Sequence, residues 1–255
     1  MHKPAKSKLG RRYTCRPPQA GHLMLVSAPR LARCGDAQPA PQPIDLRPRL
    51  TPVRDQEQEG DCFAFAGAAM CEFAHGCASE AEWLSPAYLA WRVRVAEGTF
   101  PSDSGASISD TVAIANSFGC CPEAFLPYEQ DPSEKPADDA ADLAALPYRI
   151  PVPAVVDVTD GVAVRQILSS GKVIEIGFQV FESFEDTGHD GMVPPGVGGL
   201  LGGHANLLCG WRLNAQGGVE YISRNSYSGA WGDDGYCYFP EAVLQALVFE
   251  ARTTA

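Results

Sequence analysis

The first half of the chain contains three stretches with the residue pattern of helices. Residues 62–74 are nearly all apolar or helix-forming, and Asp61 before them is a favourable N-cap residue. Residues 84–98 continue this pattern, with Ser85 as the cap and a proline in the first turn. Residues 108–119 end on a glycine, which commonly stops a helix. The sequence therefore predicts three helices in this half.

The second half of the chain changes to the shorter period of strands. Residues 186–203 are rich in glycine and proline, and we expect a long loop there, which inside a compact domain is usually functional. The residues after Pro240 fit a helix and a strand equally well. The runs that predict antiparallel strands are β-branched, aliphatic or aromatic, and comprise residues 173–180, 205–213, 219–226 and 235–240. A helical lobe followed by a β lobe is therefore expected, in the α+β class.

Composition and charge narrow the choice of function. With 255 residues, of which 45% are hydrophobic and 20% charged, the chain can bury a substantial core. Its net charge of −11 argues against binding to nucleic acid, which requires clustered cations. The charge is uneven, because residues 1–43 hold eight Lys and Arg against one acid, and the remainder is strongly acidic. The basic arm is either a solvated tail or a segment that folds back on the acidic body near the active site.

The sequence shows no convincing signal for a membrane or for export. The longest apolar run of the arm, residues 23–28, is shorter than a signal-peptide core and far shorter than a membrane span. We therefore expect no membrane span, and a protein that is either cytoplasmic or secreted without a conventional signal peptide. The nine cysteines include no pair with the Cys-x-x-Cys spacing of zinc sites, so no metal is predicted.

Cys62 is the candidate nucleophile. It stands at the predicted start of a helix, where unpaired amides and the helix dipole favour the thiolate. A catalytic thiol also needs a base, and the base needs a third group to orient it. Of the five histidines, two lie in the arm, His75 lies too far along the same helix, and His189 lies in the predicted loop. His204 follows two glycines and precedes a buried strand, which suits a base and equally suits a structural histidine.

Three stretches carry a family resemblance. DQEQEGDCFAF, GGHANLLCGW and YISRNSYSGAWGDDGY together resemble the papain-like cysteine peptidases, in which Gln, Cys, His and Asn occur in that order. The His and Asn of that family follow the Cys by ~130–150 residues, and here they follow by 142 and 163. The resemblance implies a two-lobed fold with a helical lobe, an antiparallel β-barrel-like lobe and the active site in the cleft between them.

The resemblance also implies a role for each matching residue. Cys62 is the nucleophile, His204 is the general base and then the acid, and Asn225 orients the imidazole. Gln56 donates to the oxyanion hole beside the backbone N–H of the nucleophile. The implied activity is that of a cysteine-type peptidase, which hydrolyses peptide bonds through a thiolate–imidazolium pair and an acyl-enzyme intermediate, without a cofactor.

The substrate-binding residues follow from the same resemblance. Trp231 matches the tryptophan that floors the leaving-group side, and Tyr227 stands where the family usually has the tryptophan that shields the Asn–His hydrogen bond. The stretch DSGASISDTVAIANSFGCCPEAFLPY resembles the family's substrate-binding segment, in which Gly105 pairs its backbone with an extended peptide. Gly60 and Gly203 are expected to line the cleft on either side of the nucleophile.

The residues around the nucleophile depart from the family. The usual Cys-Gly-Ser-Cys-Trp is here Glu59, Gly60, Asp61, Cys62 and Phe63, so a disulfide that the family normally forms is missing. Negative charges beside a thiolate raise its pKa. This penalty is small if Asp61 caps the helix amides and Glu59 faces solvent. Alternatively, the acids favour substrates with Lys or Arg near the cut.

The resemblance gives the chain a domain division and leaves two other functions open. We expect a basic N-terminal arm at 1–43, regulatory or cleft-covering, and a peptidase domain at 44–255, with a helical lobe at about 56–150 and a β lobe at about 151–240. The arm is shorter than the family's inhibitory propeptides. The expected partners are a peptide or protein substrate and, within the molecule, the arm itself. The alternatives are a thiol acyltransferase or amidase, which uses similar Cys–His chemistry, and a catalytically silent peptide-binding module.

Overall fold

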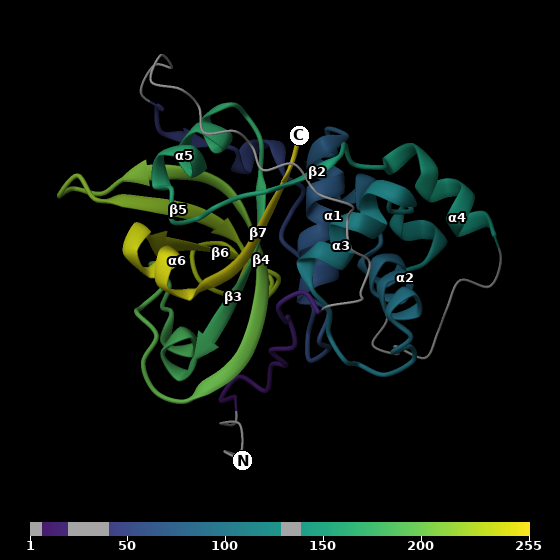
Figure 1. The fold of residues 1–255 in the computed structure, drawn as a ribbon, viewed down its shortest axis with the longest axis horizontal. Coiled ribbons are helices and arrows are strands. Elements are labelled where there is room, and N and C mark those ends of the chain that lie inside the picture. Colours follow the sequence, from purple (N-terminus) through teal and green to yellow (C-terminus); the bar gives the residue numbers. More distant parts are fainter. Residues whose placement is uncertain (1–6, 20–40, 129–138) are drawn as a thin grey trace.

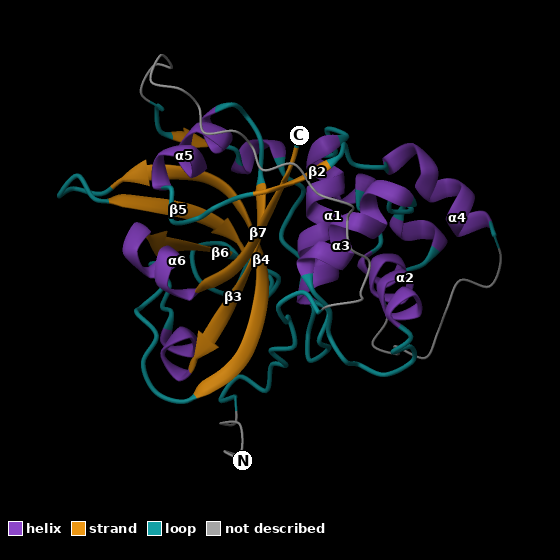
Figure 2. Ribbon diagram, viewed as in Figure 1, coloured by secondary structure: helices purple, strands orange, loops and turns teal. Residues whose placement is uncertain are grey.

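Most helices lie on one side of the molecule, and the sheet lies on the other side with the two remaining helices (Figures 1 and 2). The structure is a computed structural model, which describes residues 7–19, 41–128 and 139–255. We call the side built by α1 to α4 the helical lobe, and the side built by the sheet with α5 and α6 the β lobe. The helices are α1 (Cys62–Ala74), α2 (Pro86–Glu97), α3 (Ile108–Ser117), α4 (Ala140–Ala145), α5 (Gly161–Ser169) and α6 (Glu241–Leu247). The strands are β1 (Ile44–Asp45), β2 (Pro153–Val155), β3 (Ile174–Phe181), β4 (Leu200–Leu213), β5 (Val219–Arg224), β6 (Tyr236–Pro240) and β7 (Val248–Thr254).

The sheet is antiparallel and open. Its strands run in the order β2-β7-β3-β4-β5-β6, and β1 pairs with β4 outside this order. The predicted α+β class is confirmed. The sheet does not close into a barrel within the described residues, because its edge strands β2 and β6 do not pair with each other. The residues after Pro240 form both predicted structures in turn, first the helix α6 and then the strand β7.

The three predicted helices are present with nearly the predicted bounds. The Ser85 side chain caps α2 by accepting the Tyr88 N–H at 3.0 Å, and Gly98 ends this helix with a φ of 70°. The Ser107 side chain caps α3 in the same way. From Cys62 to Phe73, α1 is buried at every position, because the other helices cover one side and the sheet covers the other. A helix without an exposed face has no amphipathic stripe, which is why residues 62–74 are apolar at nearly every position, with Glu72 as the exception.

The predicted loop at 186–203 is shorter than expected. Strand β4 begins at Leu200, so the last four of these residues belong to the strand. In this part of β4, Gly202 pairs with Val180 and Gly203 with Gln179 of β3. The glycines that mimicked a loop in the sequence are therefore strand residues, and their lack of a side chain serves close contact with another segment.

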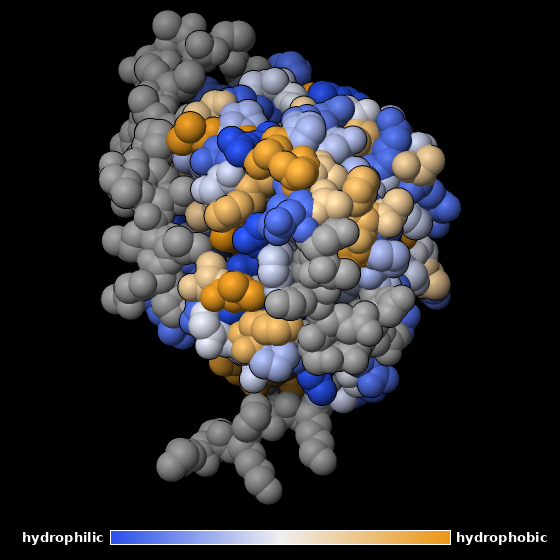
Figure 3. All heavy atoms as spheres, turned by 90° about the vertical axis from the view of Figure 1, so that its right-hand side faces the viewer, coloured by the Kyte–Doolittle hydropathy of each residue, from blue (hydrophilic) through white to orange (hydrophobic). Residues whose placement is uncertain are grey.

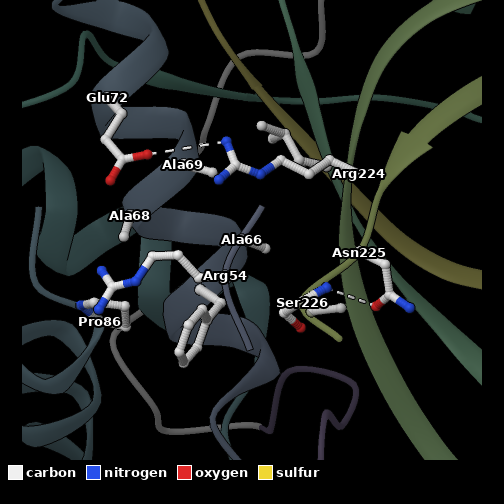
Figure 4. Close-up of a pocket in the computed structure, with 12 residues that line it drawn as sticks. Arg54, Ala66, Ala68, Ala69, Glu72, Pro86, Arg224, Asn225 and Ser226 are labelled. Atoms are coloured by element: carbon white, nitrogen blue, oxygen red, sulfur yellow. Dashed lines mark hydrogen bonds and ion pairs between the residues drawn. The ribbon is translucent and has the colours of Figure 1, made fainter. Parts of the chain in front are cut away.

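A buried polar network joins the two lobes. The Glu72 carboxylate on α1 accepts hydrogen bonds from the Thr51 hydroxyl at 2.6 Å and the Leu84 N–H at 2.9 Å. Its oxygen lies 4.0 Å from the guanidinium of Arg224, which also donates to Thr51. Figure 4 shows Glu72 and Arg224 reaching toward each other beside a small cavity between α1 and the β lobe. Burial raises the pKa of Glu72, and these partners offset part of that cost.

The outer face of the helical lobe mixes hydrophilic and hydrophobic residues (Figure 3). Its exposed apolar side chains include Phe118, Phe125 and Leu143. No helix in the described part of the chain combines the length and the hydropathy that a bilayer span needs.

Candidate active site

The predicted nucleophile, base and orienting residue come together where the lobes meet. Cys62 is the first residue of α1, His204 lies in β4, and Asn225 directly follows β5. The His204 Nε2–H donates to the Asn225 Oδ1 at 2.8 Å, and the same oxygen accepts the N–H of Ser226 at 2.8 Å. All three predicted residues are buried. Because Asn225 takes Nε2, the other ring nitrogen of His204 is left for the thiol.

The surroundings of Cys62 favour its thiolate. Burial alone raises the pKa of this thiol, but other contributions outweigh it. These are a hydrogen bond from the Cys15 thiol, the charge and hydrogen bond of His204, and a hydrogen bond from the Ala205 N–H. The pKa of Cys62 therefore lies well below the usual value of a thiol. The rise in the pKa of Cys62 that was expected from Glu59 and Asp61 is not among the leading contributions.

Aromatic rings enclose the imidazole. The ring of Tyr227 lies 4.9 Å from that of His204 at a tilt of 33°, and Phe178 lies 5.6 Å away edge to face. Trp231 packs against the Tyr227 ring at 5.5 Å and does not stack on the imidazole. The Tyr227 ring thus lies over the His204 side chain. The rings exclude water from the His204–Asn225 hydrogen bond and so strengthen it.

Gln56 is held beside the same group. Its backbone N–H donates to the Ser226 carbonyl at 2.9 Å, and its side-chain oxygen accepts the Ser226 hydroxyl. Its side-chain Nε2 donates to the Glu59 carbonyl at 2.8 Å, which leaves the second N–H of that amide for another acceptor. The side chain is fully buried, so its direction is fixed before any ligand binds.

The N-terminal arm lies between the two lobes, against the predicted substrate-binding glycines. Figure 1 shows its purple trace passing between the helices and the sheet. The Cys15 N–H donates to the Gly203 carbonyl at 2.9 Å, and the Thr14 hydroxyl donates to the Gly60 carbonyl at 2.7 Å. A Cβ atom at Gly60, Gly105 or Gly203 would collide with Thr14 or Cys15. The three glycines of the predicted cleft therefore accommodate the arm in this structure.

The basic residues of the described arm all pair with acids of the body. Arg11 binds the carboxylate of Asp55 with both terminal nitrogens, at 2.5 and 3.2 Å, and its guanidinium lies 4.4 Å above the Tyr227 ring. The remaining pairs are Lys8 with Asp186, Arg12 with Asp103, and Arg16 with Glu97. Of the two interpretations of the arm, the geometry of residues 7–19 favours the one in which it folds back on the acidic body. Residues 1–6 and 20–40 lie outside the described part.

The prediction that Asp61 caps α1 is wrong. Its carboxylate makes no cap hydrogen bond and instead binds the guanidinium of Arg94 at 2.5 Å. Arg94 is itself buried and also binds Asp103 at 2.6 Å. Burial raises the pKa of Asp61 to about 6 in spite of Arg94. The acid next to the nucleophile is thus paired with a buried arginine. Glu59 is only half-buried.

Comparisons with known proteins agree with this geometry. A family model described as the papain family cysteine protease matches residues 40–245. The chain belongs to this family. The structure resembles xylellain, a cysteine protease from Xylella fastidiosa, with a TM-score of 0.81, 25% identity, and coverage of 100% of this chain and 99% of that one. Procathepsin B of Trypanosoma congolense shares the fold, with a TM-score of 0.71 at 15% identity and coverage of 96% and 86%.

Curated relatives are of the same kind. An uncharacterised peptidase C1-like protein of Acanthamoeba polyphaga mimivirus is 29% identical over 77% of this chain and 68% of its own. A cathepsin B-like protein of Giardia intestinalis is 27% identical over 78% of this chain and 69% of its own. The protein is therefore a cysteine peptidase of the papain family, as the resemblance in its sequence implied.

The other histidines that the sequence offered stand away from the papain-family centre. His75 ends α1, and its ring nitrogen Nε2 lies 3.0 Å from the Arg149 carbonyl. His189 lines a shallow surface hollow together with Asp186 and Asp190. His2 and His22 lie outside the described residues.

Sequence reasoning missed two features of this peptidase. It gave the arm a charge but named no arm residue that meets Cys62, and the structure places Cys15 there. It also missed Arg94, whose side chain is 2% exposed. An arginine within a predicted helix looks like a surface residue, and only the pairing of Asp61 and Asp103 around it explains its burial. No local signal in the sequence announces either contact.

Proposed function

We propose that this peptidase cleaves peptide bonds through Cys62 and His204 as a thiolate–imidazolium pair. The Cys62 sulfur attacks the carbonyl carbon of the substrate, and His204 gives its proton to the leaving amine, which leaves an acyl-enzyme. His204 then takes a proton from water, which hydrolyses the acyl-enzyme and restores the thiol. The observation that carries this proposal is the low pKa of Cys62 beside an imidazole that Asn225 holds at 2.8 Å.

Gln56 and the Cys62 N–H stabilise the negative oxygen that forms during attack. Gln56 is supported by its buried bonds to Ser226 and Glu59, which hold the amide rigidly and need no rearrangement during the reaction. Donors preorganised in this way typically contribute about 3 kcal/mol each. Tyr227 protects the His204–Asn225 bond from water, and Trp231 supports Tyr227 from the other side.

The experiment that tests the catalytic proposal uses a thiol-directed epoxide on the full chain with residues 1–43 and on a chain that begins at residue 44. Wild type is expected to be labelled at Cys62 and to cleave a peptide library, and Cys62→Ala is expected to do neither. Labelling without peptide cleavage would favour an acyltransferase or amidase instead. An absence of labelling in both chains would favour a silent peptide-binding module.

We further propose that the arm, residues 1–43, inhibits the peptidase domain, residues 44–255. Two observations support this role. The arm's backbone bonds to the carbonyls of Gly203 and Ala106, and it lies so close to Gly60 and Gly105 that neither position has room for a Cβ atom. A substrate backbone needs the same positions. Removing the arm is expected to raise activity on a small substrate. The increase is expected to be larger at low salt, because screening weakens the ion pairs that hold the arm. Equal activity with and without the arm at every salt concentration would contradict this role.

The acids that hold the arm also give a proposal for substrate preference. Asp55 and Glu97 each bind an arginine of the arm. Once the arm has left, these carboxylates favour Lys or Arg in a bound peptide. Asp61 and Asp103 are excluded from this role, because both pair with the buried Arg94. A peptide library cleaved by the arm-deleted chain is expected to show faster cutting of basic than of acidic variants, and equal rates would contradict the preference.

A further inference from the structure

The arm brings a second thiol to the nucleophile. Thr14 is hydrogen-bonded to Gly60, two residues before Cys62, and Cys15 is hydrogen-bonded to Gly203, the residue before His204, so Cys15 lies beside the nucleophile in the same buried cluster. Each thiol shifts the pKa of the other, and both are reduced in this structure. Cys15 is 4% exposed and Cys62 is fully buried. Two neighbouring buried cysteines can form a disulfide when their Cα and Cβ atoms come within the range that the bond requires.

The position of Cys15 is fixed from both sides. Its own N–H is bound to Gly203, the residue before His204, and the N–H of Arg16 is bound to the Ala106 carbonyl at 3.2 Å. The sulfur packs against the backbone of Gly177 in β3, where an added Cβ would lie 3.3 Å from it. The arm therefore holds its thiol in one defined place.

We propose that Cys15 and Cys62 form a disulfide when the protein meets a peroxide, and that this bond locks the arm in place and preserves the nucleophile. The lock is opened by a thiol reductant. Its effect on activity rests on the proposed role of Cys62 as the nucleophile, whereas the formation of the bond does not.

The chemistry balances with hydrogen peroxide as the oxidant. When the arm lifts, the Cys62 thiolate attacks one peroxide oxygen, the O–O bond breaks, and the departing hydroxide takes a proton to become water. Cys62 is then a sulfenic acid. When the arm returns, the Cys15 sulfur attacks the Cys62 sulfur, the S–S bond forms and the S–O bond breaks. The hydroxide that leaves takes the proton of Cys15, so two thiols are oxidised and one peroxide is reduced to two waters.

The two thiols are suited to different steps, with Cys62 as the thiol that is oxidised and Cys15 as the thiol that then forms the disulfide. A hydrogen bond to Cys62, together with burial, raises the pKa of Cys15 well above its usual value, so this thiol stays protonated. Cys62 carries the thiolate and is the thiol that a peroxide oxidises first. Without Cys15, the sulfenic acid would have no resolving thiol and would proceed to the sulfinic and sulfonic acids, which ordinary reductants do not restore.

The test treats the full-length chain with a small excess of hydrogen peroxide and maps its peptides without reduction. Wild type is expected to yield one linked peptide that joins Cys15 to Cys62, and to lose epoxide labelling until dithiothreitol is added. Cys15→Ser is expected to lack the linked peptide, to carry Cys62 as sulfinic or sulfonic acid, and not to recover its labelling. Cys77→Ser, which removes a similarly buried cysteine at the end of α1, is the matched control and is expected to behave as wild type.

The result that overturns the proposal is an oxidised, folded wild type without a Cys15–Cys62 peptide, or equal recovery of labelling in wild type and Cys15→Ser. A linked peptide between other cysteines, such as Cys71 with Cys120, also counts against it. The outcomes are separable from the catalytic proposal. A chain that forms the link but never cleaves a peptide contradicts only the proposed function, and one that cleaves peptides but forms no link contradicts only the lock.

Discussion

Cys62 and Cys209 are equally buried, yet burial has opposite outcomes for their acidity. Neither thiol is exposed, and burial is the first cause that raises the pKa of each. For Cys209 the pKa rises to about 12, because burial and the charge of Asp45 outweigh the opposing effects of Arg224 and Arg47. For Cys62, the neighbours Cys15, His204 and Ala205 outweigh burial and lower the pKa of the thiol. Burial alone therefore does not distinguish a structural from a reactive thiol, whereas the hydrogen-bond donors around it do.

The largest expected effect comes from removing the base. His204→Ala takes away the charge and the hydrogen bond that lower the pKa of Cys62, so this thiol becomes more like Cys209. We expect kcat/KM to fall by at least about 10³-fold, as for other enzymes that lose a member of a catalytic unit. The pH at which iodoacetamide begins to modify Cys62 is expected to rise. The arm-deleted chain is the protein to use, because the arm covers the thiol.

A low alkylation pH that persisted in His204→Ala would show that the helix start and the Ala205 N–H suffice. His75→Ala is the matched control, since His75 lies at the far end of the same helix. It is expected to leave both kcat/KM and the alkylation profile unchanged.

The acid beside Cys62 provides the next comparison. The folded protein raises the pKa of Asp61 to about 6, above the value of about 3.9 for an unfolded chain. Since the raised pKa means that the folded state holds the proton more tightly, this contribution is complete below pH 4 and is lost as the pH rises through 6. The loss is on the order of 3 kcal/mol of unfolding free energy. Asp61→Asn is expected to remove it.

Urea unfolding at pH 4, 5, 6 and 7 measures this difference. The unfolding free energy of wild type is expected to fall relative to that of Asp61→Asn between pH 4 and pH 6. Parallel profiles for the two proteins would mean that Arg94 holds the carboxylate ionised throughout. Asp139→Asn, on the exposed side of α4, serves as a control that alters the same charge outside the active centre.

Replacing Cys209 tests whether this thiol has only a structural role. Cys209→Ser puts a hydroxyl where an apolar thiol packs in the core, and we expect the unfolding free energy to drop by about 1 to 2 kcal/mol. Epoxide labelling of Cys62 and kcat/KM are expected to stay at the wild-type level, as measured at a temperature where both proteins are folded. A loss of labelling without a loss of stability would mean that Cys209 acts on the centre through β4.

Most of the candidate centre could be predicted because it lies in local patterns. Cys62, His204 and Asn225 sit within contiguous motifs whose order and spacing are characteristic of the papain family. The helix bounds were predictable from caps such as Ser85 and Gly98, whose chemistry is local. The contacts that were not predictable join distant segments, as Asp61 does with Arg94. A sequence shows which charges a chain carries, but the partner of each charge is decided by the fold.

The same reason explains the errors in the β lobe. Gly202 and Gly203 were expected to belong to a loop, because glycine disfavours strands in isolation. In the structure a Cβ at either position would collide with Tyr13 or Cys15, so these glycines make room for the arm. The two glycines mark the place where the backbone of β4 contacts the backbone of the arm. A local sequence rule could not identify this contact, because the two segments are far apart in the chain.

The smallest expected effect separates the contribution of the arm from that of the base. Arg11 is mostly buried between Asp55 and the Tyr227 ring, whereas Lys8 pairs with Asp186 at a surface where both side chains are more than half exposed. A partly buried bidentate pair holds the arm by about 1 kcal/mol, and an exposed pair contributes close to nothing. In the full-length chain, Arg11→Ala is therefore expected to raise the rate of epoxide labelling of Cys62 by about fivefold. Lys8→Ala, which removes the same charge from the same arm, is expected to change it little. Equal acceleration by the two variants would mean that net charge holds the arm in place, and that the contacts of Arg11 with Asp55 and Tyr227 contribute nothing beyond it.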